Sequence, residues 1–380
     1  MENLVGMASS ARLPDIFPRS TVLVTGHTGF KGSWLCEWLL LLGAKVTGYS
    51  LEAPTQPSLF EQLALKERIT HVHGDVRDAG ALTACVREVC PDFIFHFAAQ
   101  SLVRQSYREP VETYATNVMG TVNLLDAVRL AARPCVVICA TTDKCYENRE
   151  WIHACREEDA LGGHDPYSSS KAAAEHAVSA YRRSFFENGG LAAPLVATVR
   201  GGNVIGGGDW AADRIVPDAM RALGRGAPIA VRNPGSTRPW QHVLEPLAGY
   251  LALAASLADA RRGGQLERSR DLASPFNFGP RVNSNRTVAA LADEILKHHP
   301  GTWSGTTEAG AAHEAGRLNL TIDKAFHLLG WEPVWDFERT VAETVRWYES
   351  AQKTGARELT QQQIQSYIRD AAGAGQSWAS

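Results

Sequence analysis

The sequence predicts an α/β fold, in which a doubly wound parallel sheet is followed by a smaller C-terminal α/β domain. Between Thr21 and about Leu195, short runs of β-branched and aromatic residues alternate with longer amphipathic stretches, the pattern of repeated βαβ units. Beyond Arg200 this alternation becomes irregular, and turn signals such as Gly206–Gly208 and Asn233–Gly235 separate shorter elements. A chain of 380 residues is long enough for both parts.

The elements of each part follow from these patterns. The strands predicted in the first part are Thr21–Thr25, Lys45–Tyr49, Ile69–His73, Phe93–Phe97, Val136–Ala140 and Leu195–Val199, and its helices are Lys31–Leu42, Ala79–Val89, Asn117–Ala132 and Ser168–Glu187. The helices predicted in the second part are Pro217–Leu223, Val243–Leu257, Thr287–Lys297 and Phe337–Glu349. Residues 20–200 then form the larger domain, and residues 201–353 mainly the smaller one, with some segments returning to the larger core. Residues 1–19 and 354–380 are predicted to be tails, the second being rich in Gln, Ala and Gly.

Composition narrows the range of partners. The formal net charge is −3, so the chain lacks the basic excess that nucleic-acid binding requires. No apolar run approaches the ~20 residues of a membrane span, and the start of the chain does not resemble a secretory signal. Seven cysteines without C-x-x-C spacing indicate a reducing, cytoplasmic environment. No H-E-x-x-H motif occurs, and no metal site is predicted.

A glycine-rich turn joins the first strand to the first helix. The strand runs into Gly26-His-Thr-Gly-Phe-Lys-Gly32, and the amphipathic helix follows directly. Glycines at such a turn let backbone amides approach a pyrophosphate, and the helix dipole favours its negative charge. In this context the turn predicts a dinucleotide cofactor, bound by Gly26, Thr28, Gly29, Phe30, Lys31 and Gly32.

Candidate catalytic residues follow the fifth strand and begin the fourth helix. Tyr167 and Lys171 are four residues apart, about one helical turn, and therefore share a helix face. The lysine charge is expected to lower the tyrosine pKa, so that the phenolate can exchange a proton with a substrate hydroxyl. Thr142 ends the fifth strand and is the candidate to hydrogen-bond the reacting oxygen, with Thr141 as the alternative.

The G-x-x-G-x-x-G spacing, the threonine and the Y-x-x-x-K pair resemble the extended short-chain dehydrogenases/reductases, which have a Rossmann-type fold. The resemblance implies that an acidic residue after the third strand and small residues after the fourth strand contact the cofactor. The matching positions are Asp75, Val76, Ala98, Ala99, Gln100 and Asn117, together with Tyr167 and Lys171. NAD is expected rather than NADP, because no arginine ends the second strand, where Ser50 or Glu52 can meet the ribose.

The residues after Thr142 resemble those of hexose 4,6-dehydratases, which carry Thr-Asp-Glu or Thr-Ser-Glu there. In the Thr-Asp-Glu members the Asp protonates the departing C6 hydroxyl and the Glu removes the C5 proton. Here Asp143 is kept, but Lys144 replaces the Glu. Lys144 can be neutral and act as the base, or stay charged and stabilise the enolate while another group takes the proton.

Longer motifs are similar to CDP-glucose 4,6-dehydratases specifically. They include Thr-Asp-Lys-Cys-Tyr-Glu-Asn from Thr142, Asn-Val-Ile-Gly-Gly-Gly-Asp-Trp from Asn203 and Arg-Pro-Trp-Gln-His-Val from Arg238. The resemblance spans roughly residues 21–348 and implies conversion of CDP-glucose to CDP-4-keto-6-deoxyglucose through tightly bound NAD. The side chains expected to bind the nucleotide sugar are Ser101, Arg104, Arg200, Asn203, Arg232, Arg238 and Trp240.

The resemblance also implies a homo-oligomer, a dimer or a dimer of dimers, with the helices after Asn117 and Tyr167 at the interface. Two alternatives stay open. Another nucleotide-sugar 4,6-dehydratase or a 4-epimerase would share most of these motifs, although an epimerase has no use for the acid at Asp143. A catalytically silent nucleotide-binding regulator would not need Thr142, Tyr167 and Lys171.

Overall fold

The computed structural model describes residues 11–306 and 317–379. Its centre is a seven-stranded, fully parallel sheet with the strand order β10-β6-β5-β4-β1-β2-β3. The strands are β1 Thr21–Thr25, β2 Lys45–Ser50, β3 Thr70–His73, β4 Phe93–His96, β5 Val136–Ala140, β6 Leu195–Gly201 and β10 Pro275–Phe278. The order reverses between β1 and β4, the place where open α/β sheets bind ligands beyond the carboxyl ends of their strands.

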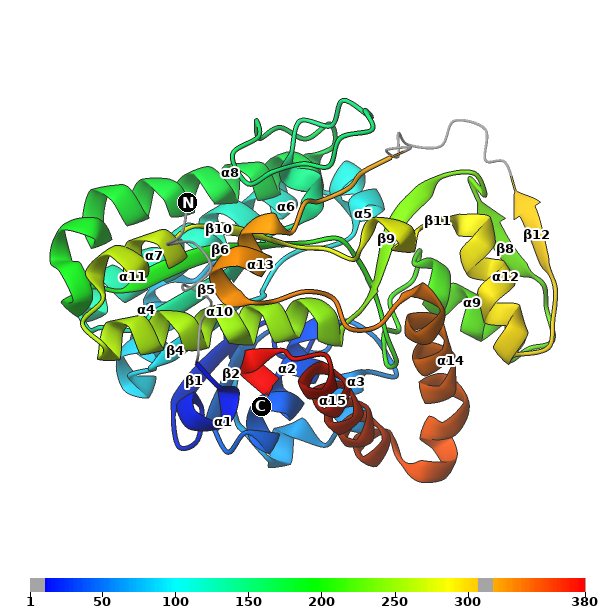
Figure 1. The fold of residues 1–380 in the computed structure, drawn as a ribbon, viewed down its shortest axis with the longest axis horizontal. Coiled ribbons are helices and arrows are strands. Elements are labelled where there is room, and N and C mark those ends of the chain that lie inside the picture. The colour runs from blue at the N-terminus through cyan, green and yellow to red at the C-terminus, as the bar shows by residue number, and fades with distance from the viewer. Residues whose placement is uncertain (1–10, 307–316, 380) are drawn as a thin grey trace.

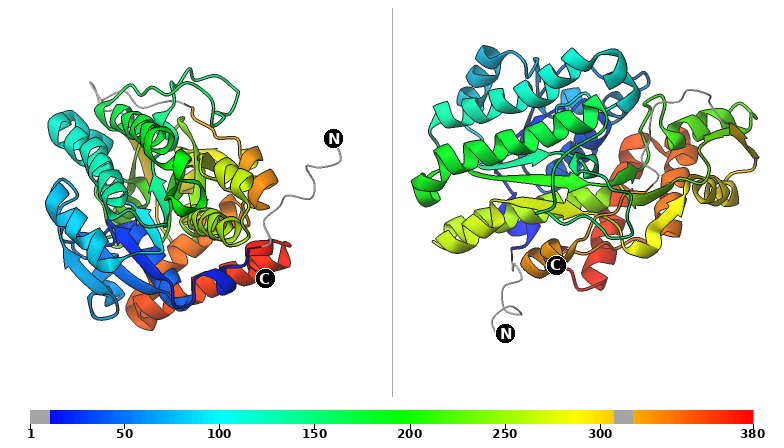
Figure 2. Two further views of the ribbon diagram at one scale, coloured as in Figure 1. Left: turned by 90° about the vertical axis from the view of Figure 1, so that its left-hand side faces the viewer. Right: turned by 90° about the horizontal axis from the view of Figure 1, so that it is seen from above.

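Helices cover both faces of this sheet (Figures 1 and 2). One face carries α4 Ala79–Val89, α7 Gly120–Ala131 and α8 Pro166–Tyr181, and the other carries α2 Phe30–Leu41 and α10 Leu244–Arg262. Shorter connecting helices are α1 Leu13–Ile16, α3 Leu59–Gln62, α5 Val103–Arg108, α6 Pro110–Tyr114, α11 Leu266–Leu272 and α13 Asp323–Leu329. The doubly wound fold class expected from the sequence is confirmed, and the predicted strands agree with the observed ones to within two residues at either end.

A smaller lobe stands beyond the carboxyl ends of the large sheet (Figure 1). It has a three-stranded sheet of β7 Asn203–Ile205, β9 Thr237–His242 and β11 Asn285–Thr287, and a parallel pair of β8 Ile229–Arg232 and β12 Trp303–Thr306. Helices α9 Ile215–Leu223, α12 Val288–His298 and α14 Phe337–Thr354 close its own apolar core. The chain leaves the large sheet at β6, returns to it in β10, and so ties the two parts together.

The expected C-terminal tail at residues 354–380 is wrong. Residues Ala356–Gly373 form helix α15, which packs along α2 (Figure 1). Tyr367 meets Trp38 edge to face at 5.9 Å between ring centroids, and Trp378 is only 1% exposed. This cover explains why α2 is apolar on nearly every side, since a helix buried all round needs no polar face.

The N-terminal segment also departs from the expected tail where it is described. The short helix α1 buries Leu13 and Ile16, and Phe17 after it is fully buried against Phe93. Residues 1–10 lie outside the described part of the chain. Among the described helices, none has the length and apolar character that crossing a membrane would require.

Candidate active site

The turn after β1 has the backbone geometry that a diphosphate requires. Gly26 has φ +74°, and a Cβ there would lie 2.6 Å from the amide nitrogen of Ala98. A Cβ on Gly32 would lie 2.3 Å from the carbonyl oxygen of Gly26. Helix α2 begins after Gly29, and no side chain caps its first-turn amides, among them those of Phe30 and Lys31. These amides therefore remain as donors for an anion at a helix N-terminus.

The ends of β2 and β3 lie beside this turn. Ser50 and Thr28 share a hydrogen bond of 2.9 Å between their hydroxyls, which ties the end of β2 to the glycine turn. Asp75 accepts from the backbone and the guanidinium of Arg77, and these hydrogen bonds lower the pKa of its carboxyl. Val76 is 4% exposed and packs against Gly120 at the start of α7. The turn, Ser50 and Asp75 thus line one edge of the sheet in the order expected for a dinucleotide.

Asn117 positions the end of β4 and does not face a cofactor. Its side chain is 1% exposed, and it accepts from the backbone amide of Gln100 and donates to the Gln100 carbonyl and the Ser170 hydroxyl. The Gln100 side chain is likewise bound to Leu102 and Thr113. Because both donors of the Asn117 amide are used within the protein, its expected contact with the cofactor is wrong. Asn117 instead links the strand end after Ala98 and Ala99 to helix α8.

Thr142, Tyr167 and Lys171 come together at the carboxyl end of β5. Asp165 caps α8 by accepting from the Ser168 amide at 2.9 Å, which places Tyr167 in the first turn. Lys171 donates from Nζ to the Ala140 carbonyl at 3.1 Å. Burial raises the pKa of Tyr167 to about 12, and a hydrogen bond with Thr142 opposes this rise.

The expected lowering of the tyrosine pKa by Lys171 stays a prediction. Burial dominates at both residues, and it lowers the pKa of Lys171 to about 8. Hydrogen bonding to Thr142 and the charge of Arg214 are the influences that lower the pKa of Tyr167. A buried ammonium loses its proton more readily than an exposed one.

Asp143 is a buried carboxyl group with an unused oxygen. It is 3% exposed, its Oδ1 accepts from the Thr142 hydroxyl at 3.0 Å, and its Oδ2 has no hydrogen-bond partner among the described residues. Burial raises its pKa, although the charges of Lys144, Lys31 and Arg238 act in the opposite direction. A carboxyl group of raised pKa, with one free oxygen in a site, is suited to donate a proton.

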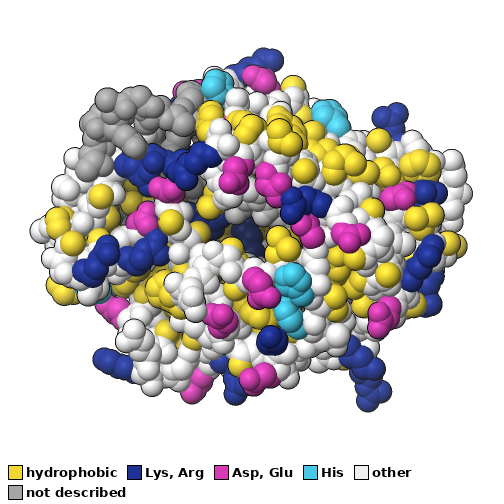
Figure 3. Space-filling view, turned by 180° about the vertical axis from the view of Figure 1, so that it is seen from behind, with side chains coloured by type: hydrophobic (Ala, Val, Ile, Leu, Met, Phe, Trp, Pro, Cys, Tyr) yellow, Lys and Arg dark blue, Asp and Glu magenta, His cyan; other side chains and the backbone are white. Residues whose placement is uncertain are grey.

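Lysine and arginine side chains surround this carboxyl group. Burial lowers the pKa of Lys31 to about 8, and the charge of Arg214 lowers it further. Arg214 donates to Asp209 at 2.9 Å and to the Ser101 hydroxyl at 3.2 Å, so it bridges the two lobes. From behind, the molecule is hollowed between the lobes, and Lys or Arg side chains lie at the bottom of the hollow (Figure 3). This charge suits a substrate that carries phosphates.

Sequence reasoning missed Arg214 and its partner Asp209. Asp209 stands in the Asn203 motif, and Arg214 follows five residues later, so the motif itself was the available signal. The ion pair lies at the start of α9, and the charge of Arg214 acts to lower the pKa of Tyr167. Arg214 is therefore a further candidate for binding the substrate.

Three of the expected substrate-binding arginines face the space between the lobes. Arg104 on α5 and Arg232 on β8 approach the same carboxylate, Asp213, at 3.8 Å and 3.3 Å. The charge of Arg238 on β9 acts to lower the pKa of Asp143, so it lies near that carboxyl group. Asn203 pairs with Trp240 in the register of β7 and β9 and is partly buried.

Arg200 and Trp240 do not belong to the substrate site, and these two expectations are wrong. Arg200 is 2% exposed, and its guanidinium donates to Glu175, the Tyr146 hydroxyl and the Glu157 carbonyl. Trp240 is 3% exposed and lies in the core of the small lobe, with its indole donating to the Arg286 carbonyl. Neither side chain leaves surface for a ligand.

Comparisons with known proteins agree with this geometry. Residues 23–253 match the family model described as GDP-mannose 4,6 dehydratase. A CDP-glucose 4,6-dehydratase of Salmonella typhimurium is 46% identical over 87% of this chain and 90% of that relative. A dTDP-glucose 4,6-dehydratase of Xanthomonas campestris pv. campestris is 29% identical over 87% of this chain and 93% of that relative.

Solved structures lead to the same family. A dTDP-glucose 4,6-dehydratase from Streptomyces venezuelae, crystallised with NAD, superposes with a TM-score of 0.72 at 25% identity, covering 87% of this chain and 97% of that structure. The resemblance inferred from the motifs is thereby confirmed. The chain belongs to the GDP-mannose 4,6-dehydratase family, among the nucleotide-sugar 4,6-dehydratases of the extended short-chain dehydrogenases/reductases.

Proposed function

We propose that this protein is a CDP-glucose 4,6-dehydratase, which converts CDP-D-glucose to CDP-4-keto-6-deoxy-D-glucose and water. The observation that carries the proposal is the buried, partly unpartnered Asp143 beside Thr142 and Tyr167, an acid placed next to the residues that act on a hydroxyl. The choice of CDP-glucose rests on the 46% identical relative and on the motifs shared with such enzymes.

NAD fits the cradle at the switch point of the sheet. Gly26 and Gly32 leave space that a Cβ would fill, and the uncapped amides of α2 suit a diphosphate. Ser50 ends β2 with a hydroxyl and no arginine stands in that strand, which suits a ribose without a 2′-phosphate. When bound, NAD would accept hydride from C4 of the sugar and return it to C6, so that it is regenerated in each turnover.

The residues of the chain handle the protons. Thr142 orients the C4 hydroxyl, and the Tyr167 Oη takes its proton. Because burial alone raises the pKa of Tyr167 to about 12, the phenolate depends on hydrogen bonding to Thr142 and on nearby positive charge. Asp143, whose pKa burial raises, keeps its proton until the C6 oxygen departs and then donates it from the carboxyl.

Lys144 has two candidate roles, and two substitutions separate them. Arginine keeps the positive charge but cannot act as a base, because it does not lose its proton. Methionine carries no charge and cannot act as a base either. If Lys144 stabilises the enolate by charge, Lys144→Arg keeps most of the activity and Lys144→Met loses it. If Lys144 is the base at C5, both variants lose activity, and neither exchanges the C5 proton with deuterated solvent.

Incubation of the purified protein with CDP-, UDP-, dTDP- and GDP-linked hexoses tests the proposal. Mass spectrometry should detect loss of one water from CDP-glucose without added NADH. Water loss from another nucleotide sugar alone would keep the dehydratase chemistry and overturn the choice of CDP-glucose. No loss from any of them would overturn the dehydratase proposal and favour a 4-epimerase or a silent regulator.

We also propose a homo-oligomer that packs through α7 and α8. Met119 before α7, Leu130 on α7 and Phe185 after α8 expose 51%, 42% and 52% of their surface, a high fraction for large apolar side chains. Replacing Met119 and Phe185 by glutamate should give a monomer in analytical ultracentrifugation, and an unchanged sedimentation coefficient would place the interface elsewhere.

Free thiols at all seven cysteines are compatible with a cytoplasmic enzyme.

A further inference from the structure

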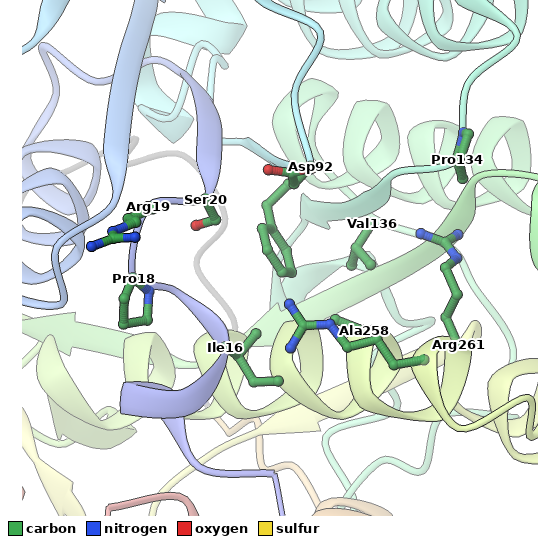
Figure 4. Close-up of a pocket in the computed structure, with 11 residues that line it drawn as sticks. Ile16, Pro18, Arg19, Ser20, Asp92, Pro134, Val136, Ala258 and Arg261 are labelled. Atoms are coloured by element: carbon green, nitrogen blue, oxygen red, sulfur yellow. The ribbon is translucent and has the colours of Figure 1, made fainter.

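The two ends of the strands in the large sheet differ in how their charged side chains are arranged. At the amino ends, a cavity of about 410 Å³ has Arg19 and Arg261 on opposite sides (Figure 4), so these guanidinium groups do not meet at one point. Beyond the carboxyl end of β3, by contrast, Arg77 joins two carboxylates, those of Asp75 and Glu112. Only this second cluster holds its charged groups in direct contact.

The cluster stands where the base of a dinucleotide would lie. β3 is the outermost strand of the sheet and lies beside β2, which in turn lies beside β1. The glycine turn after β1 suits the diphosphate, and Ser50 at the end of β2 suits the adjacent ribose. The adenine extends from this ribose away from the diphosphate, and it is therefore expected beside Asp75 and Val76, which follow β3.

The backbone after β3 is held in place from two sides. Tyr49, a buried residue of β2, donates from its hydroxyl to the Asp75 carbonyl at 3.1 Å. Asn123 on α7 donates to the carbonyls of Val76 and Arg77, at 3.0 Å and 3.1 Å. The Val76 amide has no hydrogen-bond partner among the described residues, so it can donate to a ligand.

Arg77 fixes the direction of the Asp75 carboxylate. Its amide donates to Oδ1 at 2.9 Å, its Nε donates to Oδ2 at 2.9 Å, and its Nη2 also donates to Oδ2. The remaining nitrogen, Nη1, donates to Glu112 on α6, so every nitrogen of the guanidinium is bound to a carboxylate. A carboxylate offers about four acceptor positions, so within the described part of the chain one position on Oδ1 is left for a further donor. The hydrogen bonds from Arg77 also lower the pKa of Asp75, which therefore stays charged near neutral pH.

The free acceptor of Asp75 and the free amide of Val76 match the edge of adenine, where the amino group donates and the neighbouring N1 accepts. The Asp75 side chain is 25% exposed, and without Arg77 it would populate several rotamers. We propose that Arg77 is a positioning residue for adenine recognition, because it directs the Asp75 carboxylate toward the amino group. The inference rests on the NAD site of the proposed function and not on the identity of the sugar.

Dialysis of the full chain against an equimolar mixture of NAD and deamino-NAD tests this role. Deamino-NAD has an oxygen in place of the adenine amino group, so it cannot donate to Asp75 and it brings an acceptor against the carboxylate. Because Asp75 is a charged acceptor, the bound cofactor should be NAD in about tenfold to hundredfold excess, as mass spectrometry would measure. Equal binding of the two cofactors by the unmodified protein would overturn the proposal.

Variants at Arg77 separate positioning from charge. Arg77→Gln removes the guanidinium, and the excess of bound NAD should fall to less than about threefold. Arg77→Lys keeps the charge without the planar fork and should also lose most of the excess. Arg87→Gln, at an exposed arginine on α4, is the matched control and should keep the full excess. An undiminished excess in either Arg77 variant would overturn the positioning role.

The ratio of the two bound cofactors distinguishes this role from a structural one. A variant that only loosened the fold would weaken both cofactors alike and would leave their ratio unchanged. No nucleotide sugar enters the dialysis, so the result stands apart from the choice of reaction. A protein that prefers NAD through Arg77 but removes no water from CDP-glucose would support this inference and overturn the proposed function.

Discussion

Glu175 and Asp143 are buried carboxyl groups near the same end of β5, but their surroundings differ. Glu175 receives two guanidinium hydrogen bonds from Arg200 and one from each of two threonine hydroxyls. Although burial would raise its pKa, Arg200 lowers it, so this group stays charged. Among the described residues, Asp143 receives one hydrogen bond and has one oxygen without a partner, and burial raises its pKa.

The difference assigns a structural role to Glu175 and a chemical role to Asp143. Thr141 donates to Glu175 at 2.5 Å and directly precedes Thr142, while Glu175 lies one helical turn after Lys171. The satisfied ion pair therefore holds the strand and the helix that carry the reacting groups. The burial of Asp143 with one oxygen unsatisfied lowers the stability of the fold, a cost that commonly accompanies reactive groups at catalytic sites.

Breaking the satisfied pair should have the largest effect on stability. Arg200→Met leaves the Glu175 charge buried without a cation, which should lower the free energy of unfolding by about 3–5 kcal/mol. Urea denaturation followed by circular dichroism measures this change. The double variant Arg200→Met with Glu175→Gln should recover much of the loss, and no recovery would show that lost packing, not charge, is the cause.

Changing the unsatisfied carboxyl group should instead affect turnover. Asp143→Asn removes the proton donor, so kcat should fall by about a hundredfold to ten-thousandfold, while the free energy of unfolding at pH 7 should not fall. Steady-state assays with CDP-glucose and thermal denaturation measure the two effects. Asp271→Asn, at an exposed aspartate on α11, is the control. A destabilised but active Asp143→Asn protein would show that Asp143 supports the fold and is not needed for turnover.

Glu245 extends the comparison to a buried carboxyl group that forms no ion pair with any described residue, although the charge of Arg281 acts to lower its pKa. It accepts from the Tyr367 hydroxyl and from the amides of Val334 and Trp335, yet burial raises its pKa to about 7. The folded state therefore binds its proton more tightly than the unfolded state does. The contribution of Glu245 to stability should fall as pH rises from about 4.5 through 7, by about 3 kcal/mol in total, and should change no further above about pH 8.

Glu245→Gln should remove this part of the pH dependence. Unfolding free energies of the variant and the unmodified protein, measured from pH 5 to pH 8, should differ by an amount that changes with pH. Glu349→Gln, at an exposed glutamate on α14, should leave the profile unchanged. A constant difference between Glu245→Gln and the unmodified protein would mean that Glu245 keeps an ordinary pKa.

A single hydrogen bond to the satisfied carboxylate should matter least. Thr198→Val preserves the shape of a residue that is 1% exposed and removes its 2.7 Å hydrogen bond to Glu175. The expected loss of unfolding free energy is about 1.5–3 kcal/mol, because the acceptor is charged. Thr344→Val on α14 removes a buried hydroxyl bonded to a neutral carbonyl and serves as the comparison. An equal loss of unfolding free energy in both variants would show that the charge of Glu175 does not strengthen the hydrogen bond.

Much of the large domain could be predicted from the sequence, because short strands and amphipathic helices alternate in a regular pattern. Helix α15 was missed because its surface is rich in glutamine, although Leu359, Ile364 and Tyr367 recur along its buried face. Arg200 was assigned to the substrate because a sequence does not reveal that Glu175 lies opposite it. Arg214 was missed for a related reason, since its contact with Ser101 joins residues 113 positions apart.

Incubation with CDP-glucose deuterated at C4 tests the assignment of the catalytic site most directly. If the chain catalyses an internal 4,6-dehydration, the product should have lost one water and should carry the deuterium at C6, as mass spectrometry and NMR would show. Tyr167→Phe should give no product under the same conditions. Loss of the deuterium to solvent, or recovery of a C4 epimer without loss of water, would contradict the assignment.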